Sequence, residues 1–307
     1  MLKEEILYEA ADLKDIVHDP NVARLVIDKD KIISSNLIEG IEINAEKIKD
    51  GVKVRLVVKE NQIIIKPVHL CFGVTAENAV QNIEIDAEVE KGASISLLAH
   101  CVFPVAKDVL HKMFAKIHLH EKSKYSYFER HIHSDGGGVK VIPKTKVVLE
   151  KEAKFKTEFE LVKGRVGLID MDIESECGPD SVLEMTARIS GTENDRIIIR
   201  ETGYLNGSNS KGVLASRVAV RDNAKAEIFN KLIAMGDYSR GHVDCKEIIK
   251  DNGQASAVPI VEVRNATAHV THEASIGSVD KKQLETLMSR GLNEEEATEL
   301  IIQGLLN

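Results

Sequence analysis

The apolar positions of this chain change their period twice, and each change predicts a different kind of structure. Over residues 1–17 the apolar side chains recur at the spacing of one helix face, and they are Ile6, Leu7, Ala10, Leu13 and Ile16. From about residue 51 to residue 265 this helical period is nearly absent. Short β-branched runs such as VKVRLVV, ASISLLA and RIIIRETGYL replace it, separated by clusters of Asp, Asn, Gly, Glu and Lys. The pattern predicts an N-terminal helix followed by many short strands joined by turns.

The turns between these strands resemble one another. Each has charged residues, then a small residue, then a strand, as in VEKGA, HEKS, LEKEA, CGPDS, VRDNA and IKDNG. Their last residues are at positions 93, 123, 153, 181, 224 and 253, so the gaps are 30, 30, 28, 43 and 29 residues. A repeat of this length made only of short strands is typical of a parallel β-helix, whose coils stack to bury their inner faces. The 43-residue gap predicts an insertion or a longer coil holding NGSNSKG. A β-sandwich would also show regularly spaced strands, but the likeness of the turns favours the solenoid.

The period becomes helical again after residue 275. Asp280 is placed to cap a helix, with Gln283 in the capping-box position, and Gly291 is placed to end it. Asn293 is placed to cap a second helix whose first turn holds three glutamates. This hairpin either closes the open end of the solenoid or forms a docking surface, and the sequence favours neither.

These periods divide the chain into three parts. We expect a helical or irregular N-terminal segment (1–50), a β-helix core (51–274) and a C-terminal helical region (275–307).

Composition excludes several classes of protein. The chain has 307 residues and a net charge of -8, and it has no block of Lys and Arg interleaved with aromatic residues, which argues against nucleic-acid binding. No apolar run approaches the roughly 20 residues that a membrane helix needs. The acidic, amphipathic N-terminus lacks the apolar centre of a signal peptide. We therefore expect a cytoplasmic protein that does not bind membranes.

The four cysteines are far apart in the sequence, at Cys71, Cys101, Cys177 and Cys245. Because no CxxC pair occurs, neither a zinc ribbon nor a self-contained four-cysteine iron–sulfur motif is expected. In the cytoplasm such residues are thiols. We interpret the first three as small buried hydrophobic residues.

Cys245 has a second interpretation, which comes from its spacing. It precedes His272 by 27 residues and Glu273 by 28, close to one coil of the predicted solenoid. Neighbouring strands lie about 4.8 Å apart, so the thiol would face a carboxylate or an imidazole at metal-ligand distance. The alternative is a core thiol beside a solvated His-Glu turn, and the spacing alone favours this alternative.

Two further groups of residues carry possible chemistry. His118 and His120 share one strand face, as do His131 and His133, so adjacent strands could unite all four in a metal site; surface histidines are the favoured interpretation. Lys211 either lines an interior path or belongs to a turn, and the turn is favoured. No phosphate-binding, dinucleotide-binding, GxSxG or HExxH motif is present.

Three stretches near the C-terminus carry a family resemblance. They are SRGHVDCKEII, PIVEVRNATAHVTHEASIG and LETLMSRGLNEEEATELIIQG, and with them the chain resembles the SufB/SufD family of the SUF iron–sulfur cluster assembly system. The resemblance implies a right-handed parallel β-helix with C-terminal helices. It also implies a non-enzymatic scaffold for a transient, nascent iron–sulfur cluster, with a SufC-type ABC ATPase and a second SufB/SufD subunit as partners.

The resemblance also implies roles for individual residues. Cys245 and Glu273 match family positions linked to cluster assembly at the subunit interface, with His272 beside them, and Lys211 matches a lysine of a sulfur path through the core. The family's other core cysteine has no evident match; the turn near Leu149 stands in its place. These features favour a short SufB-like subunit that forms a homodimer. The alternatives are a SufD-like subunit that holds no cluster and a cytoplasmic β-helix enzyme; the 4% aromatic content argues against a sugar-binding enzyme.

Overall fold

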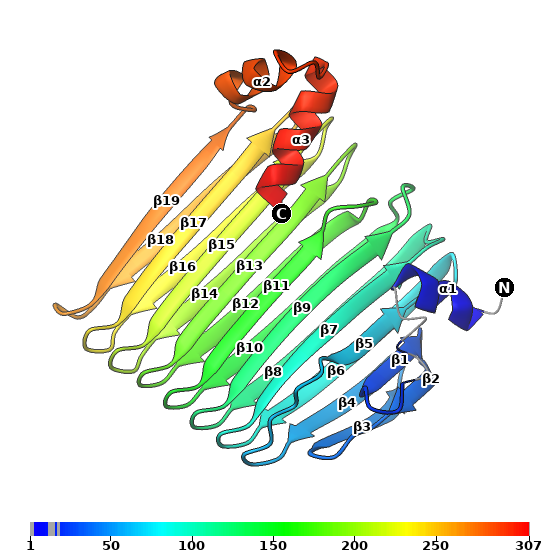
Figure 1. Ribbon diagram of the computed structural model, residues 1–307, viewed down its shortest axis with the longest axis vertical. Coiled ribbons are helices and arrows are strands. Elements are labelled where there is room, and N and C mark those ends of the chain that lie inside the picture. The colour runs from blue at the N-terminus through cyan, green and yellow to red at the C-terminus, as the bar shows by residue number, and fades with distance from the viewer. Residues whose placement is uncertain (1–2, 12–15, 17–18, 307) are drawn as a thin grey trace.

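The computed structural model describes residues 3–11, 16 and 19–306, and within them nineteen strands form two facing sheets (Figure 1). Each coil contributes one strand to each sheet, and successive coils pair in parallel, as Cys177 does with Leu205. Burial alternates along the strands, because successive side chains of a strand point to opposite faces. The apolar inner faces of both sheets form one continuous core. The predicted parallel β-solenoid is confirmed.

The two sheets differ by one strand. From edge to edge, the first sheet contains β19 (His269–Gly277), β17 (Arg240–Ile249), β15 (Lys211–Val220), β13 (Val182–Gly191), β11 (Lys154–Leu161), β9 (Lys124–His133), β7 (Ser94–Phe103), β5 (Val68–Gly73), β1 (Arg24–Asp28) and β2 (Lys31–Asn36). The second contains β18 (Gln254–Val263), β16 (Lys225–Ala234), β14 (Arg196–Leu205), β12 (Gly167–Cys177), β10 (Val139–Leu149), β8 (Asp108–Leu119), β6 (Asn78–Val89), β4 (Gly51–Val58) and β3 (Ile41–Ile48).

Two rows of tight turns join the sheets, one row along each side of the solenoid. In the row leading from the second sheet to the first, Ser181, Ser210 and Ser239 are buried. Each hydroxyl donates to the carbonyl three residues earlier, at 2.7, 2.7 and 2.8 Å. Positions 224 and 253 belong to the opposite row, between β15 and β16 and between β17 and β18. The predicted longer coil is therefore wrong, because NGSNS is a regular turn. The 43-residue gap covers one full coil, from Ser181 to Ser210, and then strand β15, which leads from one row of turns to the other.

The N-terminal end contains more β structure than expected. Strands β1, β2 and β3 lie within the segment 1–50, so the β structure begins at Arg24 and not near residue 51. β1 pairs in parallel with β5, whereas β2 and β3 each add an antiparallel strand at the edge of a sheet. The first coil thus ends in two hairpins, and the antiparallel strands β2 and β3 form the sheet edges at this end.

A short helix packs beside this end. The helix α1 (Lys3–Ala10) confirms the start of the helix predicted over residues 1–17. Its Leu7 is fully buried in a small apolar cluster with Cys71 and Val102. Leu13, predicted on the same face, lies outside the described residues.

The C-terminal helices α2 (Lys281–Met288) and α3 (Glu294–Leu306) confirm the predicted hairpin. The Asp280 carboxylate accepts from the backbone N–H of Gln283 at 2.8 Å, which caps α2. Asn293 and Glu296 form a reciprocal capping box at 2.9 Å in both directions, which starts α3. Gly291, between the helices, has a φ of 100°, a conformation that other residues rarely adopt.

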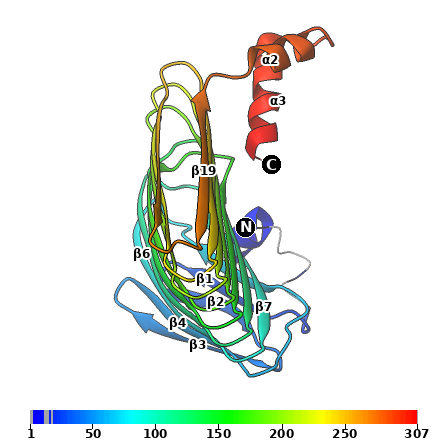
Figure 2. The ribbon, with the colours of Figure 1, turned by 90° about the vertical axis from the view of Figure 1, so that its left-hand side faces the viewer.

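The hairpin lies on the side of the solenoid and leaves its end open. Ile302 and Leu306 of α3 are buried against Ala219 of β15. Figure 2 shows the helices beside β19 and not across it. In the part of the chain that the structure describes, β18 and β19 each pair with one strand only, so each presents an unpaired edge. Within the described residues, no helix is both long and apolar enough to cross a bilayer.

Candidate functional site

A polar group lies in the core one coil before the open end, and we call it the Cys245 site. Cys245 points inward from β17 and is fully buried. Ser216 is its register partner on β15, and the Ser216 hydroxyl donates to Glu247 Oε1 at 3.1 Å. From the second sheet, Asn230 Nδ2 donates to Cys245 Sγ at 3.8 Å, and Glu201 is the register partner of Asn230. The two sheets therefore bring a thiol, two carboxyl groups, a hydroxyl and an amide together.

Burial dominates the electrostatics of the Cys245 site. It raises the pKa of Glu201 to about 8 and that of Glu247 to about 7, because a carboxylate loses its hydration in the core. Burial, together with these nearby acids, also raises the pKa of Cys245 to about 11. Among the described residues, one oxygen of each glutamate and the Asn230 carbonyl find no hydrogen-bond partner. Buried polar atoms left unpaired are uncommon, and titratable groups perturbed in this way cluster at functional sites.

The next coil brings His272, but not Glu273, to the inner face. β17 and β19 pair so that Cys245 faces Ala274 and Asp244 faces Glu273. His272 pairs with Val243, which is two residues before Cys245 on β17. Because side chains alternate along a strand, His272 and Cys245 share the inner face, and Glu273 lies on the outer face. The prediction that the Cys245 thiol faces the Glu273 carboxylate is wrong within one chain. The coil step here is 29 residues, and a shift of one residue moves a side chain to the other face.

Lys211 does not enter the core. It is the first residue of β15, its side chain is exposed, and its backbone N–H donates to the Ser181 carbonyl at 2.9 Å. The structure thus agrees with the interpretation of Lys211 as a residue next to a turn. An interior path that used its side chain, as the resemblance implies, does not fit this position.

The four histidines separate into two groups on opposite faces. His118 lies on the outer face of β8 and His120 directly follows this strand; His118 Nε2 and His120 Nδ1 are 2.9 and 3.3 Å from Glu150 Oε1. His131 and His133 point inward from β9 and are buried. A single site of four histidines is therefore wrong, and the surface interpretation holds only for the first pair.

Sequence reasoning missed a second polar group in the core, which we call the Cys101 cluster and which comprises Cys101, His111, Glu129 and His131. Cys101 Sγ is 3.4 Å from Glu129 Oε1 and 3.8 Å from His111 Nε2. His131 Nε2 is 2.8 Å from the same carboxylate oxygen. The ligand atoms of Cys101, Glu129 and His131 all lie within 4.8 Å of one another.

Protonation in the Cys101 cluster follows from its burial. Burial raises the pKa of the Cys101 thiol well above its usual range and lowers the pKa of His111 to about 3. Burial also opposes ionisation of Glu129, but the hydrogen bond and charge of His131 outweigh it and lower the pKa of Glu129. The period of two in E-R-H-I-H (129–133), in phase with buried Tyr125, was the signal that could have placed these side chains inside.

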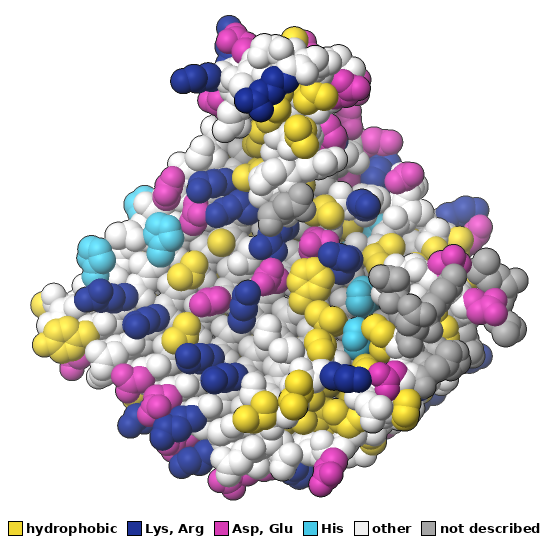
Figure 3. All heavy atoms as spheres, in the orientation of Figure 1, with side chains coloured by type: hydrophobic (Ala, Val, Ile, Leu, Met, Phe, Trp, Pro, Cys, Tyr) yellow, Lys and Arg dark blue, Asp and Glu magenta, His cyan; other side chains and the backbone are white. Residues whose placement is uncertain are grey.

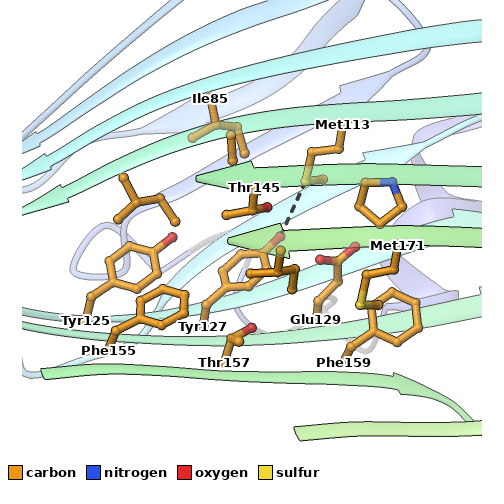
Figure 4. Close-up of a pocket in the computed structure, with 14 residues that line it drawn as sticks. Ile85, Met113, Tyr125, Tyr127, Glu129, Thr145, Phe155, Thr157, Phe159 and Met171 are labelled. Carbon is orange, nitrogen blue, oxygen red and sulfur yellow. Dashed lines mark hydrogen bonds between the residues drawn. The ribbon is translucent and has the colours of Figure 1, made fainter. Parts of the chain in front are cut away.

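A cavity of about 40 Å³ lies between the sheets next to this cluster. Figure 4 shows Tyr127 and Glu129 pointing toward Met113, and Phe159 closing one side. The Tyr127 hydroxyl is 4.0 Å from the Met113 sulfur. The volume is sufficient for a water molecule beside the cluster.

Comparisons with known proteins identify the family of this chain. Residues 72–305 match a family model described as the SufBD core domain of SUF-system iron–sulfur cluster assembly. An iron–sulfur cluster assembly SufBD family protein of Methanocaldococcus jannaschii is 38% identical over 99% of this chain and 96% of the relative. One from Pyrococcus horikoshii is 37% identical over 98% of this chain and 91% of the relative. The chain therefore belongs to the SufBD family of iron–sulfur cluster assembly proteins.

Proposed function

We propose that this chain is a scaffold subunit of the SUF machinery that holds a nascent iron–sulfur cluster as cargo at the open end of its solenoid and catalyses no turnover of its own. The position of Cys245 supports this proposal most strongly. Its thiol lies on the inner face one coil from an unpaired edge, and His272 lies on the same face of the last, exposed strand. Thiolate and imidazole are ligands that iron accepts.

A single chain does not complete this site, which is why the proposal includes a second subunit. Cys245 is sealed under β19, and Glu273 projects from the outer face, so both reach a shared cluster only if the last coil shifts. The unpaired edges of β18 and β19 offer backbone groups to another solenoid end. A second copy of this chain, or a SufB/SufD paralogue, is the partner that fits these edges.

The C-terminal hairpin is the proposed contact for a SufC-type ATPase. All eight residues of α2 are described and none is buried, and the helix packs mainly against α3. Met288 and Leu300 are 41% and 49% exposed, and apolar side chains show at the surface of the hairpin in Figure 3. These two exposed apolar side chains are the proposed contact points for the ATPase.

A double variant tests this contact. Met288→Glu with Leu300→Glu is expected to abolish co-purification with the cognate ATPase and to leave the β core folded. Val148→Glu, at an equally exposed apolar position on β10, is the matched control and should retain the ATPase. Retention of the ATPase by the double variant would contradict the docking role.

A SufD-like role without a cluster is the second candidate, and the outward position of Glu273 favours it. Anaerobic reconstitution with iron and sulfide, in the presence of the ATPase, separates the two roles. A scaffold should hold iron and acid-labile sulfide in the wild type, lose both in Cys245→Ser, and keep both in Cys177→Ser, a buried cysteine outside the Cys245 site. Absence of a cluster from the wild type, with the ATPase still bound, would support the SufD-like role.

A further inference from the structure

The hydrogen bonds behind His111 determine which of its nitrogens faces the Cys101 cluster. Gln81 Nε2 donates to two backbone carbonyls, those of Lys29 and Gly73, each at 3.0 Å. Gln81 Oε1 therefore faces His111 Nδ1 at 2.8 Å, and an amide oxygen only accepts. His111 Nδ1 must carry the proton. Its Nε2 then directs a lone pair toward Cys101 Sγ.

A second chain of hydrogen bonds does the same for His131. His133 Nδ1 is 3.1 Å from the carbonyl of Arg165, so it must donate there. His133 Nε2 then accepts from His131 Nδ1 at 3.1 Å. The remaining nitrogen, His131 Nε2, meets the Glu129 carboxylate at 2.8 Å, and a proton must lie between them. Without that proton, two lone pairs would face each other.

The four inward atoms thus form a ligand set with its supporting partners already in place. Metal-binding histidines characteristically donate their other N–H to a carbonyl or similar acceptor, which fixes the ring and the tautomer. His111 donates to Gln81, and His131 donates to His133. Phe103, fully buried, packs against the His111 and His131 rings at centroid distances of 5.2 and 6.2 Å.

We propose that the Cys101 cluster binds one divalent transition-metal ion of the Zn²⁺ or Fe²⁺ class, with Cys101, Glu129 and His131 as ligands and His111 as the fourth. On binding, the ion displaces the thiol proton of Cys101 and the proton between His131 and Glu129. Two positive charges enter and two leave, so the net charge of the buried cluster is unchanged. This balance matters because an uncompensated charge in the core is costly.

The donor set selects the class of ion. Thiolate and imidazole suit zinc, iron and cobalt, whereas Mg²⁺ and Ca²⁺ require oxygen ligands. The competing surface group, which is His118, His120 and Glu150, has no sulfur. A thiolate-to-metal charge-transfer band therefore distinguishes the two groups.

Cobalt(II) binding tests the proposal in the Cys245→Ser background, which removes the other candidate thiol. The metal is added anaerobically, without sulfide or ATPase, both to the folded protein and during refolding, so that burial of the cluster does not prevent loading. We expect about one tightly held ion per chain with a thiolate charge-transfer band. The band should persist in Cys71→Ser and His120→Ala and disappear in Cys101→Ser.

Zn²⁺ provides a second readout that does not depend on the cobalt spectrum. It should raise the unfolding temperature of the Cys245→Ser protein and have at least tenfold weaker affinity for Glu129→Gln, an isosteric change. Circular dichroism checks that each variant folds. Absence of a charge-transfer band after both loading routes, or its persistence in folded Cys101→Ser, would overturn the proposal.

Discussion

The interiors around Cys101 and Cys245 share one fold and differ in how their polar atoms are satisfied. The two cysteines lie on the same sheet, five strand spacings apart, or about 24 Å. Around Cys101, the His111 and His131 nitrogens all meet a partner, and the nearest sheet edges are the antiparallel strands β2 and β3. Around Cys245, carboxyl and amide oxygens have no partner among the described residues, and the nearest sheet edges are the parallel strands β18 and β19. The polar atoms of the first group are satisfied within one chain, whereas those of the second leave hydrogen-bonding capacity unused among the described residues.

This difference explains why one solenoid can carry two kinds of site. Stacked coils repeat a backbone frame, and only the inward positions of a few strands decide the local chemistry. A closed, charge-balanced cluster suits a single ion. The Cys245 site, with its thiol and with oxygen atoms that lack a partner among the described residues, lies next to an open end and suits the proposed iron–sulfur cluster shared with another subunit.

The largest expected effect comes from breaking the pair inside the Cys101 cluster. His131→Leu leaves the Glu129 carboxylate buried without its partner and should lower the free energy of unfolding by about 3–5 kcal/mol. Denaturant titration measures it. A loss below 1 kcal/mol would mean that the pair is not the buried, fully satisfied unit described above.

In the Cys245 site, by contrast, a substitution is expected to stabilise the protein. Since the pKa of Glu201 is raised to about 8 in the folded chain, above its ordinary value, its contribution to stability is present at low pH and is lost as the pH rises toward 8. Glu201→Gln should therefore be more stable than the wild type above pH 8, by a few kcal/mol, and similar to it below pH 4.5, the pKa of an ordinary glutamate. Glu227→Gln, on the outer face of β16, should show no such pH-dependent gain in stability over the wild type. Equal pH profiles for wild type and Glu201→Gln would contradict this assignment.

Blocking the open edge should have a moderate effect. Ala274→Lys places a charge on the inner, exposed face of β19 and is expected to weaken self-association by about tenfold or more, which is about 1.4 kcal/mol. Ser275→Lys, its neighbour on the outer face, is the control. Analytical ultracentrifugation measures both, and equal dissociation constants would exclude this edge from the interface.

The smallest effect should come from the outer face of β9. Arg130 stands between Glu129 and His131 in sequence but points outward, where its Nε bonds Glu160 at 2.7 Å. Arg130→Ala should cost less than about 1 kcal/mol, because exposed ion pairs contribute little. A loss as large as that of His131→Leu would remove the contrast between the two faces.

The repeat predicted the fold well because turn chemistry is local. Charged turns at intervals near 30 residues, and caps at Asp280 and Asn293, depend only on nearby residues. The mistaken long coil arose because the turns of both rows look alike in sequence. Strands before residue 50 were missed because β2 and β3 are antiparallel additions outside the repeat, and the parallel strand β1 has only five residues.

The candidate site was harder to predict because it depends on register. The spacing of Cys245 and Glu273 is 28 residues and the coil step is 29, and this single residue decides which face Glu273 occupies. Cys101 was missed because its partners come from two other strands, β8 and β9, and only the three-dimensional stack brings Glu129 and His111 to its thiol.

The most direct test of the two-site account is metal and acid-labile sulfide content after anaerobic reconstitution of Cys101→Ser and Cys245→Ser side by side. Sulfide is supplied chemically, and each chain is pre-loaded with Zn²⁺ and paired with its ATPase. The account predicts that Cys245→Ser keeps about one zinc ion and loses iron and sulfide, and that Cys101→Ser loses the zinc and keeps the cluster. Loss of both from either variant, with the fold intact, would show that the two cysteines serve one site and would contradict the account.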